Sequence, residues 1–434
     1  MRRGISSVLF LCAISTVIFS TDTSVAADVN STVIALRLSN TITGGSLPVS
    51  DPIFTNMANR VQAGDIQGAA ALAANSKYFA GYLARRLAMQ MQNAALDAFG
   101  MTDNDSTAFI IAKFAGSAGG GRPSISSLWS DNATYLVDLA GVPTHVASLN
   151  ATQLAAVDWT ALVRQEGQQV KDTQNVVIPL PAKHVGGYLT LSDRPNDNSF
   201  AMYGATAGTN LRFIEGIWET ATGLELMNVA SKSARVQDVP RFIPEYDPNF
   251  FNGQGQPACI ACHGGGMASV NHGYAAVADI FDFTNNNGFI YNAAPATNQR
   301  KSLGSNAGQR NNVNTCNLVQ RPTTVCNPDS VGVDANQSWD LAATWEASGV
   351  LSRMGWTGAK QGQGLNALGV ALGQSKIVYE FLTERVIGEV CPMGSFSASD
   401  IASIAASANP NASTPGTDDI RTIVARVASH ASCL

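Results

Sequence analysis

Residues 259–263 read Cys-Ile-Ala-Cys-His, and the rest of the chain is best interpreted outward from them. Two thiols three positions apart can form thioether bonds with the two vinyl groups of one porphyrin. The adjacent imidazole then meets the iron from the same turn of the chain. The stretch therefore predicts one covalent haem c, attached through Cys259 and Cys262, with His263 as the proximal iron ligand.

Two other kinds of site use a similar spacing of cysteines. A dithiol redox pair is expected in a thioredoxin-like βαβ context, and half of a zinc site needs a second ligand pair nearby. Neither context surrounds residues 259–263. Because the motif occurs once, we expect a protein with one haem and not one that conducts electrons along a series of haems.

The second axial ligand of the iron decides between functions. A strong protein ligand favours electron transfer, whereas an open position permits ligand binding or oxygen chemistry. The sequence leaves this ligand open: Met354 and His272 are the leading candidates, and Met267, Met393 or no protein ligand are the alternatives. The remaining histidines show no ligand spacing, and we expect them to be ordinary hydrogen-bonded residues: His145, His184 and His430.

Residues 1–27 have the pattern of a secretory signal. Two arginines at positions 2 and 3 precede an apolar run from Val8 to Phe19, and Val25-Ala26-Ala27 suits cleavage after Ala27. The run is shorter than the ~20 residues of a membrane span, and no later stretch reaches 18 apolar residues. We therefore expect a periplasmic or secreted protein with no transmembrane span.

Export places the cysteines in an oxidising compartment. Cys316, Cys326, Cys391 and Cys433 can pair in three ways, and bonds between nearest neighbours are favoured. A Cys316–Cys326 bond would pin a long Asn-rich loop, and a Cys391–Cys433 bond would join the C-terminal helices. A lipid anchor on Cys12 is a competing interpretation of the leader, disfavoured because a leucine and not a small residue precedes it.

Composition excludes several classes of protein. The 434 residues are 45% hydrophobic, which argues against a disordered or collagen-like chain. Charged residues make up only 14% of the chain, with 27 basic and 32 acidic side chains. The chain therefore has no basic excess with which to bind a nucleic acid backbone, and we expect none as a partner.

Hydrophobic periodicity predicts a mainly α fold with few short strands. We expect a helical N-terminal region over 28–175, a cytochrome c-like haem region over 176–335 and a helical C-terminal region over 336–434. No linker of tether length separates them, which favours one compact body. The N-terminal region is expected to open on an irregular lead-in over 28–50, and 176–181 and 186–191 look extended. Helices are expected over 51–99, 106–115, 128–139, 152–164, 210–226, 269–283, 339–354, 365–390, 399–407 and 418–431.

From about Asp51 onward, the chain resembles the planctomycete-type family of secreted one-haem cytochromes built from domains of unknown function. In place of the family's Met-Asp-Pro after the haem motif, this chain has Met267-Ala268-Ser269. The resemblance implies the haem and the architecture but no particular reaction. Besides the haem motif, the stretches that carry it are Gly186–Thr190, Leu211–Thr222, Met267, Phe281-Asp282, Gly355-Trp356, Gly364–Gly369, Ser375, Val390-Cys391 and Cys433.

These observations favour one-electron transfer between periplasmic redox partner proteins. A haem enzyme of peroxidase or oxidase type with an open distal position is the first alternative, and a non-redox haem-containing binding module is the second. Gly-x-Ser-x-Gly, His-Glu-x-x-His and dinucleotide-binding motifs are absent from the sequence. Whether the protein is an enzyme is left open, with electron transfer preferred because the haem is the only recognisable chemical group.

Overall fold

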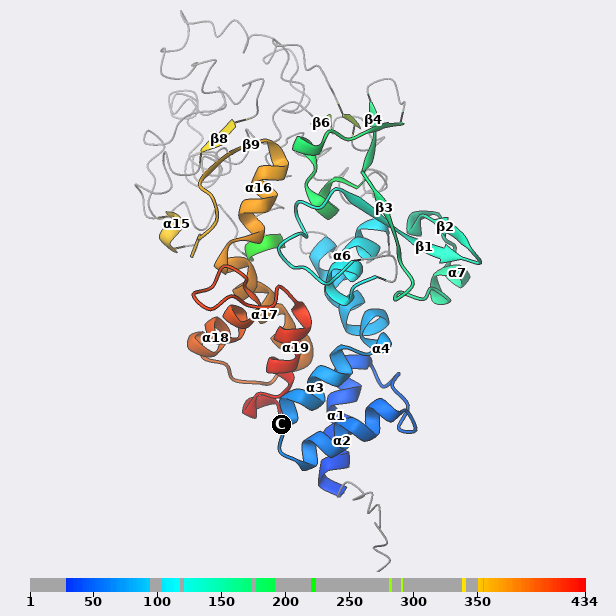
Figure 1. Ribbon diagram of the computed structural model, residues 1–434, viewed down its shortest axis with the longest axis vertical. Helices are drawn as coiled ribbons and strands as arrows, with labels where there is room; N and C mark the ends of the chain where they lie inside the picture. Colours follow the sequence, from blue (N-terminus) through cyan, green and yellow to red (C-terminus); the bar gives the residue numbers. More distant parts are fainter. Residues whose placement is uncertain are drawn as a thin grey trace, which may run out of the picture.

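The computed structural model describes residues 29–93, 104–117, 121–172, 177–191, 220–223, 281–282, 290–291, 338–340, 350–353 and 355–434. Within these ranges helices predominate and strands are few and short, which confirms a mainly α protein. Figure 1 shows an elongated body in which the N-terminal and C-terminal helices lie together, with the strands toward the other end.

The N-terminal end consists of α1 (Val29–Thr43), α2 (Pro52–Gln62) and α3 (Ile66–Ala74). Asp51 caps α2 by accepting the Ile53 N–H at 2.9 Å, and Pro52 occupies a first-turn position that needs no amide donor. Asp65 caps α3 by accepting the Gly68 N–H at 2.8 Å. Two capped helices therefore follow α1 in quick succession.

The expected irregular lead-in over 28–50 is wrong for α1. Its buried face combines apolar Ala35 and Ile42 with Ser39 and Thr43. The Thr43 hydroxyl donates a hydrogen bond at 2.8 Å to the Ser39 carbonyl. This bond within the helix satisfies the hydroxyl group, so the Thr43 side chain can be buried. Because polar residues fill half of the buried stripe, the helical repeat is concealed in the sequence.

The next helical stretch follows the predicted pattern. α4 (Lys77–Phe79), the π-helical η1 (Ala80–Ala84) and α5 (Arg85–Asn93) run in succession. Helices were expected over 51–99, and this is confirmed as far as Asn93, with buried apolar residues at every fourth position: Phe79, Leu83, Leu87 and Met91.

At the centre of the body lies α6 (Asp105–Ala115), whose residues are buried on all sides as far as Phe114. Asn104 and Thr107 form a capping box at its start. A three-stranded antiparallel sheet packs on α6, with β1 (Ala133–Leu139) between β2 (Val142–Thr144) and β3 (Val163–Glu166). The ring of Phe109 on α6 meets that of Tyr135 on β1 edge to face, with centroids 5.4 Å apart.

The helices expected over 128–139 and 152–164 are therefore wrong. The first stretch contains β1, and the second holds only the short α7 (Ala151–Ala155) before β3 begins. The first five residues of β1 are buried, on both faces of the sheet. A short apolar run without alternation cannot be distinguished from a buried helix by periodicity.

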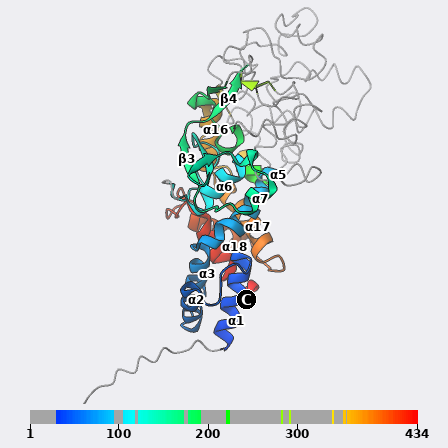
Figure 2. The ribbon, with the colours of Figure 1, turned by 90° about the vertical axis from the view of Figure 1, so that its right-hand side faces the viewer.

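The C-terminal region contains α16 (Gly364–Gly373), α17 (Lys376–Val390), α18 (Ala398–Ala408) and α19 (Ile420–Ala428). The helix expected over 365–390 is divided at Gln374 and Ser375, and α18 and α19 match their predictions. The helix expected over 339–354 is wrong at its start, where residues 339–340 belong to β8 (Ser338–Asp340). It is confirmed over α15 (Val350–Arg353). Figure 2 also shows α17 and α18 near α3, and α19 packs directly on α3.

Glycines allow α16 to pack with its backbone against the loop before β1. A Cβ atom on Gly369 would lie 1.9 Å from the carbonyl oxygen of Trp129, and one on Gly373 would lie 2.0 Å from that of Ser126. Gly187, at φ +60°, approaches the carbonyl oxygen of Leu128 in the same way, and the Tyr188 N–H bonds to that oxygen at 3.1 Å. The loop is thus held between Gly187, which is 59 residues after Leu128, and Gly369, which is 240 residues after Trp129.

Asp418 fixes the other side of this loop. Its carboxylate accepts hydrogen bonds from the hydroxyls of Ser124 and Ser126, both at 2.7 Å, and from the Ser126 N–H at 2.8 Å. It also accepts one from the buried Tyr379 hydroxyl at 2.9 Å, and this contact together with burial raises the pKa of Tyr379. Asp418 adopts a positive φ of 55°, which is uncommon outside glycine and is tolerated best by Asn and Asp.

The Cys391–Cys433 disulfide joins the end of α17 to η12 (Ala431–Cys433), with Cα atoms 5.4 Å apart. This confirms the nearest-neighbour pairing for these two cysteines. Closing a loop of 42 residues stabilises the folded state by about 4 kcal/mol in the chain-entropy model. Cys316 and Cys326 lie outside the described residues.

All of the buried hydrophobic residues that the structure describes except Leu136 form a single cluster, which extends from Ala35 to Cys433 and includes Ala221. The three regions therefore share one core within the described ranges. The region boundaries near residues 175 and 335 remain predictions.

The close approach of α16 predicts opposite effects for two glycine substitutions. Gly369→Ala should lower the free energy of unfolding by roughly 1–3 kcal/mol or more, because the new methyl group meets a backbone carbonyl that cannot move alone. Gly388→Ala in α17, where a Cβ atom meets nothing within 4 Å, should raise it by about 0.5–1 kcal/mol. Denaturant unfolding measures both, and equal shifts for the two variants would contradict the packing described.

Candidate functional site

The candidate haem site lies outside the described residues. This holds for Cys259, Cys262 and His263, and for three candidate second ligands, Met354, His272 and Met267. The described structure does contain short segments on either side of the motif in sequence. They show where the chain that carries the motif meets the rest of the protein.

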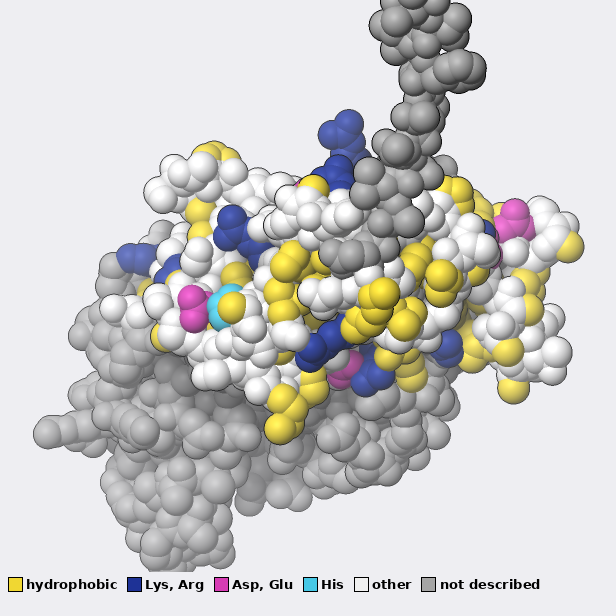
Figure 3. Space-filling model, turned by 90° about the horizontal axis from the view of Figure 1, so that it is seen from below, with side chains coloured by type: hydrophobic (Ala, Val, Ile, Leu, Met, Phe, Trp, Pro, Cys, Tyr) yellow, Lys and Arg dark blue, Asp and Glu magenta, His cyan; other side chains and the backbone are white. Residues whose placement is uncertain are grey.

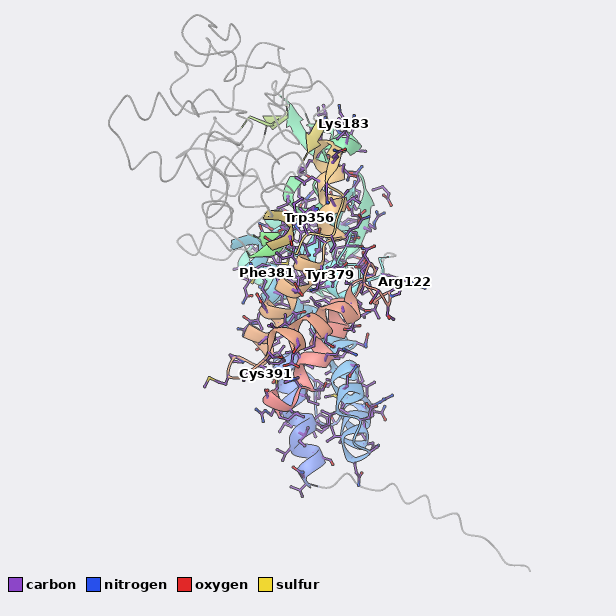
Figure 4. All side chains as sticks on the ribbon, turned by 90° about the vertical axis from the view of Figure 1, so that its left-hand side faces the viewer. Arg122, Lys183, Trp356, Tyr379, Phe381 and Cys391 are labelled. Atoms are coloured by element: carbon purple, nitrogen blue, oxygen red, sulfur yellow. A yellow bond between two sulfur atoms is a disulfide. The ribbon has the colours of Figure 1, made fainter. Side chains whose placement is uncertain are left out.

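Upstream of the motif, residues 220–223 are held against α17. Thr220, Ala221 and Thr222 are buried. Gly223 has a φ of +69° and lies so close to Phe381 that a Cβ atom would be 2.3 Å from its ring. The Arg385 guanidinium lies 4.5 Å from the centre of the same ring (Figure 4), so Phe381 packs between the segment and a cation.

Downstream of the motif, two short strands join a sheet formed by the N-terminal half of the chain. β4 (Gln169–Asp172) pairs with β5 (Val177–Pro179) on one side and, in parallel, with β7 (Ile290–Tyr291) on the other. β6 (Phe281–Asp282) completes the order β5-β4-β7-β6. The helix expected over 269–283 is therefore wrong at its last described residues, 281–282, because they pair as a strand.

A third connection lies further along the chain. β8 pairs in antiparallel fashion with β9 (Gln361–Gln363), which leads directly into α16. Trp356 is buried before β9 and donates its indole N–H to the Ala359 carbonyl at 3.1 Å. The chain on both sides of residues 259–263 is thus attached to the body that carries the first and last helices.

The stretch from Gly186 to Thr190 was expected to be extended, and this is wrong. It forms a 3-10 turn, η4 (Gly187–Thr190), organised around the buried Gln168. The Gln168 amide donates to the Gly187 carbonyl at 2.8 Å and accepts from the Thr190 hydroxyl at 2.7 Å. These long-range hydrogen bonds satisfy the turn's polar groups, which a sequence pattern of glycines and apolar residues does not reveal.

His184 is a buried histidine on the turn η3 (Ala182–His184), which packs against α16 near the labelled Lys183 (Figure 4). Burial, together with the neighbouring Lys183 ammonium, lowers the pKa of His184 to about 4. The imidazole is therefore neutral at physiological pH.

The Nδ1 atom of His145 forms a hydrogen bond with the fully buried Asp105, whose second carboxylate oxygen accepts the Val146 N–H at 2.6 Å. His430 stacks on Phe396, with ring centres 4.3 Å apart. It also accepts the Ser432 N–H at 3.3 Å. Both contacts agree with the prediction that these are ordinary hydrogen-bonded histidines.

Met393, the one candidate second ligand that the structure describes, is 95% exposed on the loop after Cys391. Within the described ranges no group of three or more His, Cys, Asp or Glu side chains is arranged to hold a metal ion.

A buried charge network was missed by sequence reasoning. Lys113 of α6 is buried and pairs with Asp131, which also accepts from Arg164 at 3.0 Å. The ammonium lies 5.4 Å from the ring centre of Phe109 and 5.6 Å from that of Tyr135. A lysine in an otherwise apolar helical run was the available signal, since such a residue is rarely buried without a partner.

No family model, curated protein or solved structure matches this chain. None of the helices in the described residues is long and apolar enough to cross a membrane.

The neutral state of His184 predicts a pH dependence of stability. Between about pH 4 and pH 6.5 the unfolded chain binds a proton at this position that the folded chain does not. The free energy of unfolding should therefore fall as the pH is lowered through this window, by up to about 3 kcal/mol from this group. His184→Asn should flatten the slope of denaturant-derived stability against pH. An equal slope in wild type and His184→Asn would refute the assignment.

Proposed function

We propose that this protein is an exported one-haem c-type cytochrome that transfers single electrons between periplasmic redox partner proteins. The observation that carries the proposal is the sequence Cys-Ile-Ala-Cys-His at residues 259–263. The secretory pattern of residues 1–27 supports it, because this class of protein acquires its haem outside the cytoplasm.

The residues of the motif suit the group chemically. Cys259 and Cys262 would hold the porphyrin by two thioether bonds, and His263 would bind the iron through a neutral imidazole nitrogen. When bound, the haem supplies an iron that alternates between the ferric and ferrous states. The chain's part is to hold the group in one position, to limit water around it and to set its potential through axial ligation and burial.

The attachment of neighbouring segments supports a fixed site. Residues 220–223 pack on Phe381, and residues 281–282 and 290–291 belong to the sheet that begins with β5. A cofactor site functions best when rigid helices or strands hold the residues that contact the cofactor. Most of the chain serves as scaffold in this proposal, which leaves ample surface for partner proteins.

Covalent attachment is tested on the denatured polypeptide. The exported protein should retain its pigment through acid–acetone extraction and stain for haem on a denaturing gel. Cys259→Ala combined with Cys262→Ala should abolish this stain. The matched control, Cys391→Ala with Cys433→Ala, removes two cysteines that form a disulfide and should keep the stain. Loss of pigment from the wild-type chain on extraction would refute covalent haem.

A second experiment separates electron transfer from haem enzymology. The optical spectrum of the ferrous protein should be low-spin and unchanged by carbon monoxide, because a protein ligand on each face of the iron leaves no position for the gas. Met354→Ala and His272→Ala, made separately, test the two leading second ligands: loss of the true ligand should give a high-spin, carbon-monoxide-binding spectrum. A wild-type protein that binds carbon monoxide would favour a peroxidase-type or oxidase-type enzyme instead.

A further inference from the structure

Met393 places a sulfur atom on the surface of the C-terminal region. Its side chain is 95% exposed, whereas Met57 and Met91 are fully buried in the core. Methionine usually serves to fill gaps between packed side chains, and at this exposure it fills none. The packing of the fold therefore does not account for a thioether at this position.

A tight turn holds Met393 in this exposed position. The Gly394 N–H donates to the Cys391 carbonyl at 2.8 Å, which closes a four-residue turn with Pro392 and Met393 at its two central positions. Proline suits the first central position because its φ is fixed. The other residues that dominate such turns are Gly, Asn, Asp and Ser, so the methionine is not there to form the turn.

Two contacts anchor the turn to the body. Cys391 at its start is bonded to Cys433, and just after it the Ser395 carbonyl accepts the Ser432 hydroxyl at 2.8 Å. A Cβ atom on Gly394 would lie 2.4 Å from the Cys391 Sγ atom, so the turn packs directly on the disulfide. The turn therefore keeps its shape whatever the chemical state of the methionine side chain.

The sulfur atoms around the turn differ in oxidation state. The turn borders a groove of roughly 250 Å³, which is lined by both cysteines of the disulfide and by Met393. Because the disulfide has no thiol left to oxidise, Met393 supplies the one reduced sulfur among the described residues that line this groove. Figure 3 views the body from the end at which α1 and the C-terminus lie, and hydrophobic side chains are exposed there among polar ones.

We propose that Met393 is a site of reversible oxidation by hydrogen peroxide. Its sulfur attacks one peroxide oxygen, so that an S–O bond forms, the O–O bond breaks and water leaves. A thiol-dependent sulfoxide reductase restores the thioether: two thiols become one disulfide, and the oxygen leaves as a second water. The anchors of the turn do not involve the Met393 sulfur, so the cycle consumes peroxide without altering the fold. Neither step involves the proposed haem.

Peptide mapping by mass spectrometry tests the proposal on the full exported protein. After brief treatment with hydrogen peroxide, the peptide with Met393 should have gained one oxygen atom about tenfold faster, or more, than the peptides with Met57 and Met91, because the oxidant reaches an exposed sulfur first. Methionine sulfoxide reductases with dithiothreitol should remove this oxygen from the folded protein. The free energy of unfolding should be the same before and after oxidation of Met393.

A matched variant and a measurement in cells complete the test. Met393→Leu keeps a side chain of similar size without the sulfur, so it should lose the rapidly oxidised peptide and keep the stability of wild type. Protein recovered from its native cells should carry the Met393 sulfoxide after peroxide exposure and lose it once the peroxide is removed.

Three results would overturn the proposal. If Met393 reacts as slowly as Met57 and Met91, its sulfur is protected by the iron or by a partner protein and is not an oxidation site. A fall in stability on oxidation of Met393 would show that the fold depends on the thioether. A sulfoxide that never forms in cells, or that persists there, would show that no cycle operates.

Discussion

The contact between the backbone of α16 and the loop over residues 124–131 holds the described body together. Gly369 and Gly373 let the helix approach within the space that a side chain would occupy, and the carbonyl groups of Trp129 and Ser126 fill that space. Gly187 makes the equivalent approach to Leu128. Such approaches tolerate little adjustment, because interiors are close-packed and the opposing atoms belong to the main chain. The loop therefore fixes α16, the turn η4 and the start of β1 relative to each other.

Buried polar groups complete this arrangement. Gln168 satisfies the turn η4, and Asp418 gathers hydroxyl and amide donors from the loop and from Tyr379. Asp131 pairs with both Lys113 and Arg164 beside the central helix, and Glu166 is a second partner of Arg164. A buried polar group without a partner costs about 1–3 kcal/mol, so each network is stable only when all of its members are in place. This explains how a chain with only 14% charged residues can place several of them in its interior.

Contacts of the same kind explain the structural role of several residues in the C-terminal region. Gly364 lies against the Lys183 backbone, and Gly369 lies against Trp129. Ser375 accepts the Gly358 N–H at 3.0 Å and precedes α17. Cys391 and Cys433 form the disulfide. These residues support the scaffold, and the proposed redox function rests on the motif at residues 259–263.

The sequence by itself determined the features that depend on near neighbours. The Cys-Ile-Ala-Cys-His motif is one, since the haem proposal rests on five consecutive residues. The helix with Phe79, Leu83 and Leu87 is another, because one apolar stripe repeats without interruption. The Cys391–Cys433 pairing followed from proximity along the chain.

Only the tertiary structure decided features whose partners are distant in sequence. Residues 133–139 form a strand because they pair with β2 and β3 in one sheet on which α6 packs, although their apolar run equally suits a helix. α1 accommodates buried Ser39 and Thr43, whose polarity concealed its repeat. His145 meets Asp105 across 40 residues, a contact without a local signal. In each case the deciding energy comes from packing or pairing between segments, which local periodicity does not record.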